Sequence, residues 1–401
     1  MVHGACRVAT HLPLAACALR IFHLHVAAPA NTPVLAPTEL SREPVARSQW
    51  ALIGERLARH RLASASLFLL AALYLLAAGA EFFAPYTRSW RDLSHAYCPP
   101  QLPRLSLAHG LHAFAMRSAV DPLSFKRTYL EDTAQPIALG FFVRGEPYRL
   151  WNLFTWDRHF FGPSEISAGA TFYFLGADKY GEDIFSRLVY GSRISLSVGL
   201  VSIAVTFFLG LTIGGVSGYV GGATDLVIQR VIEIVNAFPQ IPLWLAFGAV
   251  LPAEWSPLST YFAITLVLSL LGWTGLARVV RGKILALREE DYAVAARLLG
   301  ASHARILFRH LVPGFASHII VVLTLSVPAM ILGETSLSFL GLGLRSPIVS
   351  WGVMLQDCLS IQNVANYPWL LMPVVLIVLT VLCFNFLGDG LRDAADPYSN
   401  A

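Results

Sequence analysis

Long apolar runs separated by shorter polar segments are the main feature of this chain. A helix that crosses the hydrocarbon core of a bilayer needs about 20 mostly apolar residues. Six segments have this character: 64–83, 194–219, 226–251, 260–280, 318–340 and 369–391. The pattern predicts an all-α integral membrane protein with six transmembrane helices.

The third of these segments, 226–251, is the least regular. Arg230, Glu233 and Asn236 lie in its first half, and two prolines follow. Proline is tolerated in a membrane helix where neighbouring groups satisfy the freed backbone, so we expect a helix with soft boundaries. Arg230 and Glu233 are spaced i, i+3 on one helix, and this spacing favours a structural ion pair near the membrane interface.

The composition agrees with a lipid environment. Apolar residues make up 55% of the 401 residues and charged residues 13%, and the mean hydropathy is +0.59. Soluble domains carry about 25% charged residues, so this chain has too few to cover a globular surface. The net charge of +4 is small and its basic residues cluster in loops. That distribution indicates orientation in a membrane and not nucleic-acid binding.

The short loops differ in their content of basic residues, and this difference predicts the orientation. The loop between the fifth and sixth segments contains only Arg345. Basic residues are far more frequent before the first segment and between the fourth and fifth: Arg47, Arg56, Arg59 and Arg61, then Arg281, Lys283, Arg288, Arg297, Arg305 and Arg309. Loops rich in Lys and Arg stay in the cytoplasm. We therefore expect a multi-pass protein of the cytoplasmic (inner) membrane with both termini in the cytoplasm.

The same pattern divides the chain into five regions. Residues 1–48 are expected to be a disordered extension, or to precede the true start of translation. The others are an N-terminal transmembrane segment (49–92), an extracytoplasmic loop domain (93–188), the main transmembrane domain (189–392) and a C-terminal tail (393–401). Within the large loop between spans 1 and 2, strand-like runs at 137–143 and 148–155 lie among prolines. They predict a small, irregular and partly β-structured cap.

A short helix is predicted in the basic loop between the fourth and fifth segments. Residues 291–299 place Tyr292, Ala295, Ala296 and Leu299 on one helical face. The alanines are strong helix formers and allow close approach of another backbone. The segment is too polar to cross a bilayer, so we expect it to lie at the cytoplasmic surface.

A second helix is expected directly after it. Gly300 suits the left-handed position that ends a helix, Ser302 can cap the next one, and Pro313 would end that one. A passive helix lying on lipid headgroups is the alternative interpretation. Two helices with a glycine joint in one short loop favour a docking element instead.

The residues of this loop carry a family resemblance. The block Tyr292-Ala-Val-Ala-Ala-Arg-Leu-Leu-Gly300-Ala-Ser resembles the coupling loop of ABC-importer permeases, with Val294 where that family has Glu. Further blocks at 175–183, 186–196, 336–343, 350–355 and 385–397 resemble the oligopeptide and dipeptide branch. The resemblance implies that the ATPase-coupling loop comprises Tyr292, Val294, Ala295, Ala296, Arg297, Gly300, Ala301, Ser302 and Pro313.

The resemblance also implies a set of partners. In such importers six spans form one half of a pore, and a homologous second permease subunit forms the other half. Two cytoplasmic ATPase subunits bind the coupling loops, and an extracytoplasmic solute-binding protein delivers peptides or similar small solutes. This chain contains no G-x-x-x-x-G-K-S/T phosphate loop. We therefore expect a transport subunit that is not an enzyme, binds no cofactor itself and depends on ATP used by its partners.

Two polar residues within spans are candidates for the translocation path, Glu334 and Asn236. A charged side chain at mid-bilayer costs about 2.5–3.5 kcal/mol on insertion scales, so it should face the protein interior or a water-filled path. A structural role for Glu334, satisfied by Thr335, Ser336 or a partner helix, is equally compatible with the sequence.

Other classes of membrane protein make different predictions. A secondary transporter would show internal repeats with broken helices in corresponding halves, and no repeat is visible. An intramembrane enzyme would need a metal motif or a nucleophile with a base, and none is visible either. His109 and His112 lack the further ligands that a metal site needs, so no metal is expected.

Overall fold

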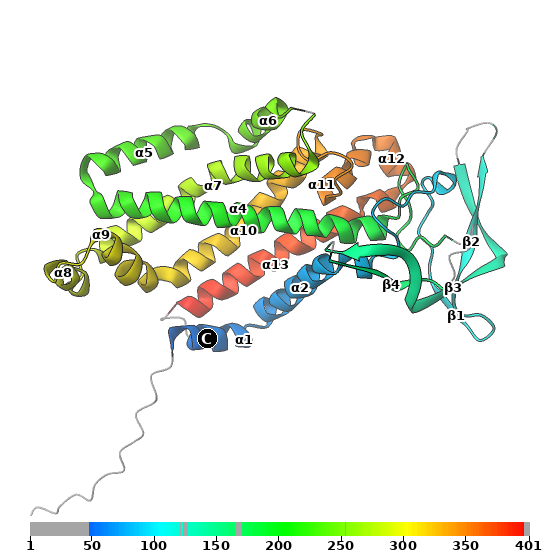
Figure 1. Cartoon of the computed structure of the whole chain (residues 1–401), viewed down its shortest axis with the longest axis horizontal. Helices are drawn as coiled ribbons and strands as arrows, with labels where there is room; N and C mark the ends of the chain where they lie inside the picture. Colours follow the sequence, from blue (N-terminus) through cyan, green and yellow to red (C-terminus); the bar gives the residue numbers. More distant parts are fainter. Residues whose placement is uncertain are drawn as a thin grey trace, which may run out of the picture. The chain divides into compact units, whose positions relative to one another are not determined.

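The computed structural model describes residues 48–120, 122, 127–151, 153–164, 171–252 and 254–396. The extension predicted at 1–48 therefore lies outside the described residues except for Ser48, and so does the end of the tail, 397–401. The described part is mostly helical (Figure 1).

The helices begin and end as follows: α1 (Gln49–Arg59), α2 (Arg61–Ala78), α3 (Ala80–Phe83), α4 (Ile184–Val220), α5 (Gly222–Ala237), α6 (Gln240–Val250), α7 (Pro257–Leu287), α8 (Asp291–Leu298), α9 (His303–Arg305), α10 (Ala316–Phe339), α11 (Trp351–Met354), α12 (Ile361–Asn366) and α13 (Met372–Ala395). Helices α2, α4, α7, α10 and α13 lie side by side in one bundle (Figure 1). Short 3-10 turns are η1 (Leu93–His95), η3 (Val312–Phe315), η4 (Leu355–Leu359) and η5 (Pro368–Leu371), and η2 (Ile306–Leu311) is a π-turn.

Five helical stretches in the described part are long and apolar enough to cross a membrane. They contain α2, α4, α7, α10 and α13, in the order that the sequence predicts. The chain is thus a multi-pass membrane protein. A sixth crossing would have to come from α5 and α6 together.

The irregular segment predicted over 226–251 is interrupted at the first of its two prolines, Pro239. Helices α5 and α6 are bent by 82° relative to each other. The residue before a proline is disfavoured in the helical region, and Phe238, which precedes Pro239, is extended with φ −87° and ψ 135°. The helix therefore ends at Ala237, and the third predicted segment is divided into two helices.

The loop between α3 and α4 contains a four-stranded antiparallel sheet, so the all-α description is too narrow. Its strands β1 (Arg104–Ser106), β2 (Gly110–Val120), β3 (Arg127–Leu150) and β4 (Phe154–Pro163) are ordered as in the chain. Two prolines lie inside β3, both at irregularities of the strand pairing. Pro136 lies beside the register shift at Phe114, and Pro147 lies within the shift between Arg144 and Tyr148. Proline is compatible with a strand at such irregularities.

A stripe of glycines brings α4 and α7 together. Gly210, Gly214 and Gly218 follow each other at intervals of four residues, the spacing that allows close approach of membrane helices. A Cβ atom on Gly214 would lie 2.4 Å from the carbonyl oxygen of Ala277, and one on Gly218 would lie 2.8 Å from that of Arg281. The backbones of the two helices are in contact only because these side chains are absent.

Candidate docking site at the α8 end of the bundle

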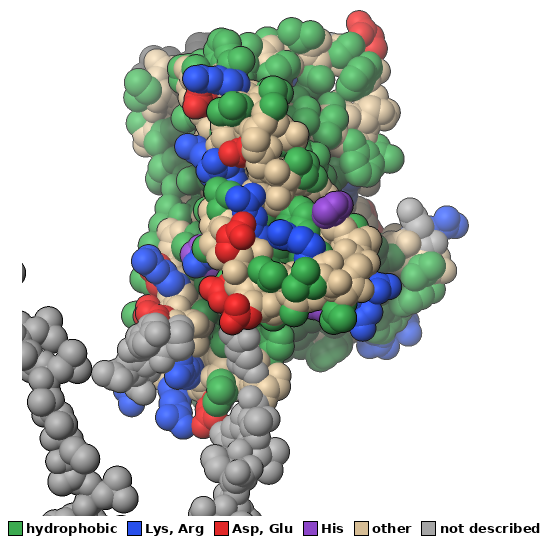
Figure 2. Space-filling model, turned by 90° about the vertical axis from the view of Figure 1, so that its left-hand side faces the viewer, with side chains coloured by type: hydrophobic (Ala, Val, Ile, Leu, Met, Phe, Trp, Pro, Cys, Tyr) green, Lys and Arg blue, Asp and Glu red, His purple; other side chains and the backbone are tan. Residues whose placement is uncertain are grey.

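Helix α8 lies at the end of the bundle that also carries α1 and the end of α13 (Figure 1). The two ends of the described chain meet there, since the Arg56 guanidinium donates to the carbonyl of Asp396 at 2.7 Å. Figure 2 views this end directly and shows Lys and Arg side chains spread over its apolar and polar surface. The basic residues that predict orientation, as far as they lie in the described part, belong to α1, α2, the end of α7 and the segment from α8 to η2.

The C-terminus of α8 is closed by a Schellman motif. The N–H of Gly300 donates to the carbonyl of Arg297 at 3.0 Å, and the N–H of Ala301 donates to that of Ala296 at 3.1 Å. Gly300 has φ +79°, a conformation that is strained for residues with a Cβ atom. The glycine thus turns the chain sharply between α8 and α9.

One face of α8 packs on the bundle. Ala293 is fully buried, and Val294 and Ala296 are half-buried. Ala293 and Ala296 belong to an apolar cluster that includes Ile284 of α7 and Ile306. Ala296, which the sequence places on the same face as Tyr292 and Leu299, therefore faces inward.

The opposite face is exposed and mostly apolar, with the exposed Asp291 at its start. Tyr292 is 46% exposed, Leu298 83% and Leu299 88%, and Ala295 beside them is also exposed. We call these four residues the docking face. Several large apolar side chains exposed together mark a binding surface more often than a solvated one.

The second helix differs from the prediction. Ser302 caps α9, because its hydroxyl accepts from the N–H of Arg305 at 3.4 Å. Pro313, however, does not end a separate helix: it lies in η3, and the chain continues through it directly into α10. Ile306 and Leu311 of η2 are fully buried. Pro313 fits because the first turn of a helical segment does not need its N–H.

Hydrogen bonds connect α8 to the end of α4. Arg297 donates to the carbonyl of Arg288 at 3.5 Å, and Arg288 donates to the carbonyl of Gly218 at 3.2 Å. His303 lies 3.2 Å from the hydroxyl of Tyr219. Together with Val220 and Glu289, these side chains line a groove of about 580 Å³ beside α8. A displacement of α8 would therefore reach the end of α4 through Arg288.

An ion pair fixes the turn between α4 and α5. Arg281 of α7 makes two hydrogen bonds to Asp225, both at 2.6 Å, and the Ser217 hydroxyl donates to the same carboxylate at 2.5 Å. Gly221 and Gly222 form the turn with φ of +68° and +56°. From the sequence, Arg281 contributes only to the positive charge of its loop. Its ion pair with Asp225 could not be predicted, because the two residues are 56 positions apart.

The candidate path residue Glu334 lies fully buried in α10. Its carboxylate accepts hydrogen bonds from the hydroxyls of Ser338 and Ser350 at 2.8 Å and of Ser195 at 3.3 Å. Ser195 belongs to α4 and Ser350 caps α11, so one carboxylate joins three elements of the bundle.

The neighbours considered from the sequence do not supply these bonds. Ser336 donates to the carbonyl of Leu332 at 2.7 Å, and the Thr335 hydroxyl has no hydrogen-bond partner among the described residues. Asn236, the other path candidate, accepts from the Thr274 hydroxyl at 3.0 Å. Among the described residues, Asn236 and Glu334 have no hydrogen-bond partner in common.

The ion pair expected between Arg230 and Glu233 is present. The Arg230 guanidinium lies 2.7 Å from the Glu233 carboxylate. Both side chains are largely exposed, so the pair contributes at most about 1 kcal/mol.

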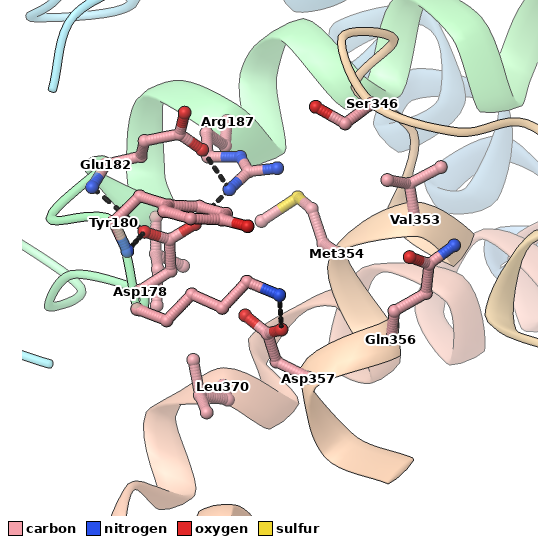
Figure 3. A pocket seen from close by; sticks show the side chains of 12 residues that line it. Asp178, Tyr180, Glu182, Arg187, Ser346, Val353, Met354, Gln356, Asp357 and Leu370 are labelled. Atoms are coloured by element: carbon pink, nitrogen blue, oxygen red, sulfur yellow. Dashed lines mark hydrogen bonds and ion pairs between the residues drawn. The ribbon is translucent and has the colours of Figure 1, made fainter. Parts of the chain in front are cut away.

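A cavity of about 130 Å³ lies at the opposite end of the bundle, between the segment before α4 and the turns after α11 (Figure 3). Lys179 forms an ion pair with Asp357 at 2.7 Å, and Arg187 contacts both Asp178 and Glu182. The charged side chains around this cavity pair with each other, and these ion pairs hold the segment before α4 against the turns after α11. No group of three or more His, Cys, Asp or Glu side chains in the described residues could hold a metal ion.

Two family models match this chain. The "binding-protein-dependent transport system inner membrane component" matches residues 210–398, and the "N-terminal TM domain of oligopeptide transport permease C" matches residues 48–100. The first match includes α8 and the docking face. Residues 101–209, which include the sheet, lie outside both matches.

Individual relatives agree with these matches. The oligopeptide transport system permease protein of Bacillus subtilis is 39% identical over 226 residues, which cover 56% of this chain and 72% of the relative. The glutathione transport system permease protein of Pectobacterium atrosepticum is 39% identical over 262 residues, covering 65% and 83%. Among solved structures, a chain of an inward-facing methionine ABC transporter aligns with a TM-score of 0.41 and 18% identity, covering 53% and 98%.

Proposed function

This chain belongs to the family of binding-protein-dependent transport system inner membrane components, and from that premise we propose that it is the permease subunit of an ATP-driven importer. The observation that carries the proposal is the docking face on α8. A short helix that is firmly packed on one side and apolar on the other is suited to bind another protein. It is held by the same bundle that would form the path.

We propose peptides or similar small solutes as the cargo. The support comes from relatives named as oligopeptide and glutathione permeases. The family models match residues 48–100 and 210–398, which include α2, α7, α10 and α13 of the bundle, where a path would lie. The sheet has no counterpart in the family models and offers no guide to the cargo.

The proposed orientation places the α8 end in the cytoplasm and the sheet outside. It rests on the basic residues gathered at the α8 end, since Lys and Arg are retained on the cytoplasmic side. Both termini would then be cytoplasmic, in the inner membrane. The docking face would meet cytoplasmic subunits.

The proposed complex contains a homologous second permease, two ATPase subunits and an extracytoplasmic solute-binding protein. ATP would be used by the ATPase subunits, and this chain would bind no cofactor. Binding of ATP would draw the ATPases together, and each would carry the α8 bound to it. Arg297, Arg288 and the end of α4 would pass that movement to the bundle, because they are joined by hydrogen bonds. Alternation between two rigid arrangements would expose the path to each side in turn.

The test replaces one leucine of the docking face. Leu299→Glu puts a charge on the exposed apolar surface without disturbing the packed face. We expect affinity-tagged protein from its native membrane to lose the co-purified ATPase subunits, and proteoliposomes to lose ATP-dependent uptake of a labelled tripeptide. The matched control is Ile361→Glu, since Ile361 of α12 is equally exposed at 85% but lies at the other end of the bundle (Figure 1). Undiminished co-purification with Leu299→Glu would overturn the proposal.

A further inference from the structure

The hairpin formed by β3 and β4 exposes large apolar side chains where a soluble hairpin would carry polar ones. Trp151 is 57% exposed, Leu153 81% and Phe154 54%. We call these three residues the hairpin tip. They lie in the part of the chain that no family model matches, so the properties of the family do not account for them.

The tip is attached to the last residue of a membrane span. The indole N–H of Trp151 donates to the carbonyl of Ala78 at 2.9 Å, and Ala78 ends α2. The guanidinium of Arg193 lies 4.7 Å from the centre of the Trp151 ring. Arg193 also donates to the carbonyls of Ala77 and Ala78, both at 3.0 Å. The tip is therefore held at the level where α2 ends.

That level corresponds to the boundary between hydrocarbon and water. Helix α2 has 18 residues and rises by about 27 Å at 1.5 Å per residue. The hydrocarbon core of a bilayer is about 30 Å thick. A helix that enters the core at Arg61 therefore reaches the other interface close to Ala78, whichever side of the membrane the sheet occupies.

The base of the hairpin is held just as firmly. Phe82 of α3 stacks on Trp156 with ring centres 5.8 Å apart, and it contacts Phe142 and Phe160, each at 5.9 Å. Because α3 follows α2 directly, this aromatic cluster ties both strands to the end of the span. The tip cannot move away from the membrane without breaking these contacts.

Its chemistry suits an interface with lipid. Tryptophan and phenylalanine combine large apolar area with affinity for the headgroup boundary, and tryptophan is enriched there in membrane proteins. Arg144 and Arg149 of β3 are exposed on the same hairpin, where they can reach lipid phosphates while their stems cover apolar surface. Helix α2, at whose end the tip is held, also exposes large apolar side chains, among them Phe68 and Leu75.

We propose that the hairpin tip inserts into the headgroup boundary of the leaflet on the sheet side, and that the β3–β4 hairpin is an interfacial anchor for the sheet. Lipid is the occupant of this surface. Trp151 and Phe154 lie among the upper acyl carbons and Leu153 makes contact beside them. The anchor keeps the sheet in contact with the membrane surface at the end of α2. Its existence does not depend on the cargo or on ATP.

The experiment uses the full chain in nanodiscs, with its five native cysteines replaced by alanine. An environment-sensitive nitrobenzoxadiazole dye is attached at Leu153→Cys. The matched control is Leu107→Cys, because Leu107 is fully exposed in the β1–β2 turn, away from α2 (Figure 1). We expect blue-shifted emission at position 153 that nitroxide-labelled lipids quench, and neither effect at position 107. Adding Phe154→Glu should reduce the quenching at 153.

Three results would overturn the proposal. The first is an unquenched dye at position 153. The second is equal quenching at 153 and 107, which would mean that the sheet adheres to lipid unspecifically. The third is quenching at 153 that disappears in the complex purified with its partner subunits from native membranes, because the tip would then be covered by protein.

Discussion

The carboxylate of Glu334 accepts a hydrogen bond of 2.8 Å from the hydroxyl of Ser350, which lies 16 residues further along the chain. The oxygen of Ser350 in turn accepts from the N–H of Val353 at 3.2 Å and so caps α11. Ser195 is used in the same way: it donates to Glu334 and accepts from the N–H of Trp351. The Glu334 carboxyl thus orients the hydroxyls of Ser350 and Ser195, whose oxygens hold the backbone of α11.

This arrangement makes a prediction for Glu334→Gln. The amide nitrogen of Gln can only donate, so at least one serine hydroxyl loses its acceptor. A buried polar group left unsatisfied costs about 1–3 kcal/mol, and we expect a clear fall in the melting temperature of the purified protein. Ser336→Ala, which removes a hydroxyl bonded only within α10, is the control and should change it little. If Glu334→Gln melted like the wild type yet abolished uptake, Glu334 would belong to the translocation path.

The glycine stripe between α4 and α7 makes a second prediction. Gly214→Ala places a methyl group 2.4 Å from the carbonyl oxygen of Ala277, so the two helices must move apart. Overpacking of this kind costs about 1–3 kcal/mol. In contrast, a Cβ atom on Gly275 of α7 would meet nothing within 4 Å, and Gly275→Ala should be neutral or stabilising. Melting temperatures in one detergent compare the two variants, and equal values would contradict the close approach.

The sequence predicted the features that depend on local chemistry. The five apolar stretches follow from their length. The turn at Gly300 follows from the backbone preference of glycine, and the cap at Ser302 follows from the reach of its side chain to a backbone group a few residues away. Contacts between distant segments could not be predicted in this way. Arg281 and Asp225 are 56 residues apart and Ser195 and Glu334 are 139 apart, and no local pattern pairs them. The spacing of Gly210, Gly214 and Gly218 was a local signal for helix contact that the sequence analysis did not use.

The sheet was predicted only in part for a different reason. Prolines normally argue against a long strand, and β3 contains two. Both lie beside register shifts, which can be recognised only when the partner strand is known. The inward-facing position of Ala296 has a similar origin, since the side of α8 that packs on the bundle is set by Ile284 and Ile306 of other segments.

Gly300 provides the third prediction. Its φ of +79° is strained for alanine, while an added Cβ would meet nothing within 4 Å. Gly300→Ala should therefore lose about 1 kcal/mol through backbone strain alone, with faster amide hydrogen exchange in α8. Gly300→Asn is the control, because asparagine tolerates the left-handed conformation and should exchange more slowly than the alanine variant. The reverse order would show that α8 does not end in this motif.

Asp183 gives a prediction for the pH dependence of stability. Its side chain caps α4, since it accepts from the N–H and hydroxyl of Ser186, both at 2.7 Å. Burial raises the pKa of Asp183 from 3.8 to about 6, and the hydrogen bonds from Ser186 offset this only in part. The folded form then holds its proton more tightly than the unfolded form. The stability that this proton provides is fully present below the unfolded pKa and is lost as the pH rises through about 6.

The melting temperature of the wild type should therefore fall between about pH 4 and pH 7 relative to that of Asp183→Asn, which cannot titrate. A pKa difference of this size corresponds to at most about 3 kcal/mol over the window. Asp393→Asn, at an exposed position of α13, is the control and should follow the wild-type profile, because its side chain loses little water on folding. If wild type and Asp183→Asn kept a constant difference across the window, the carboxyl would not be desolvated as the buried cap requires. If the wild type instead gained stability with rising pH, the hydrogen bonds that Asp183 accepts from Ser186 would outweigh burial at this end of α4.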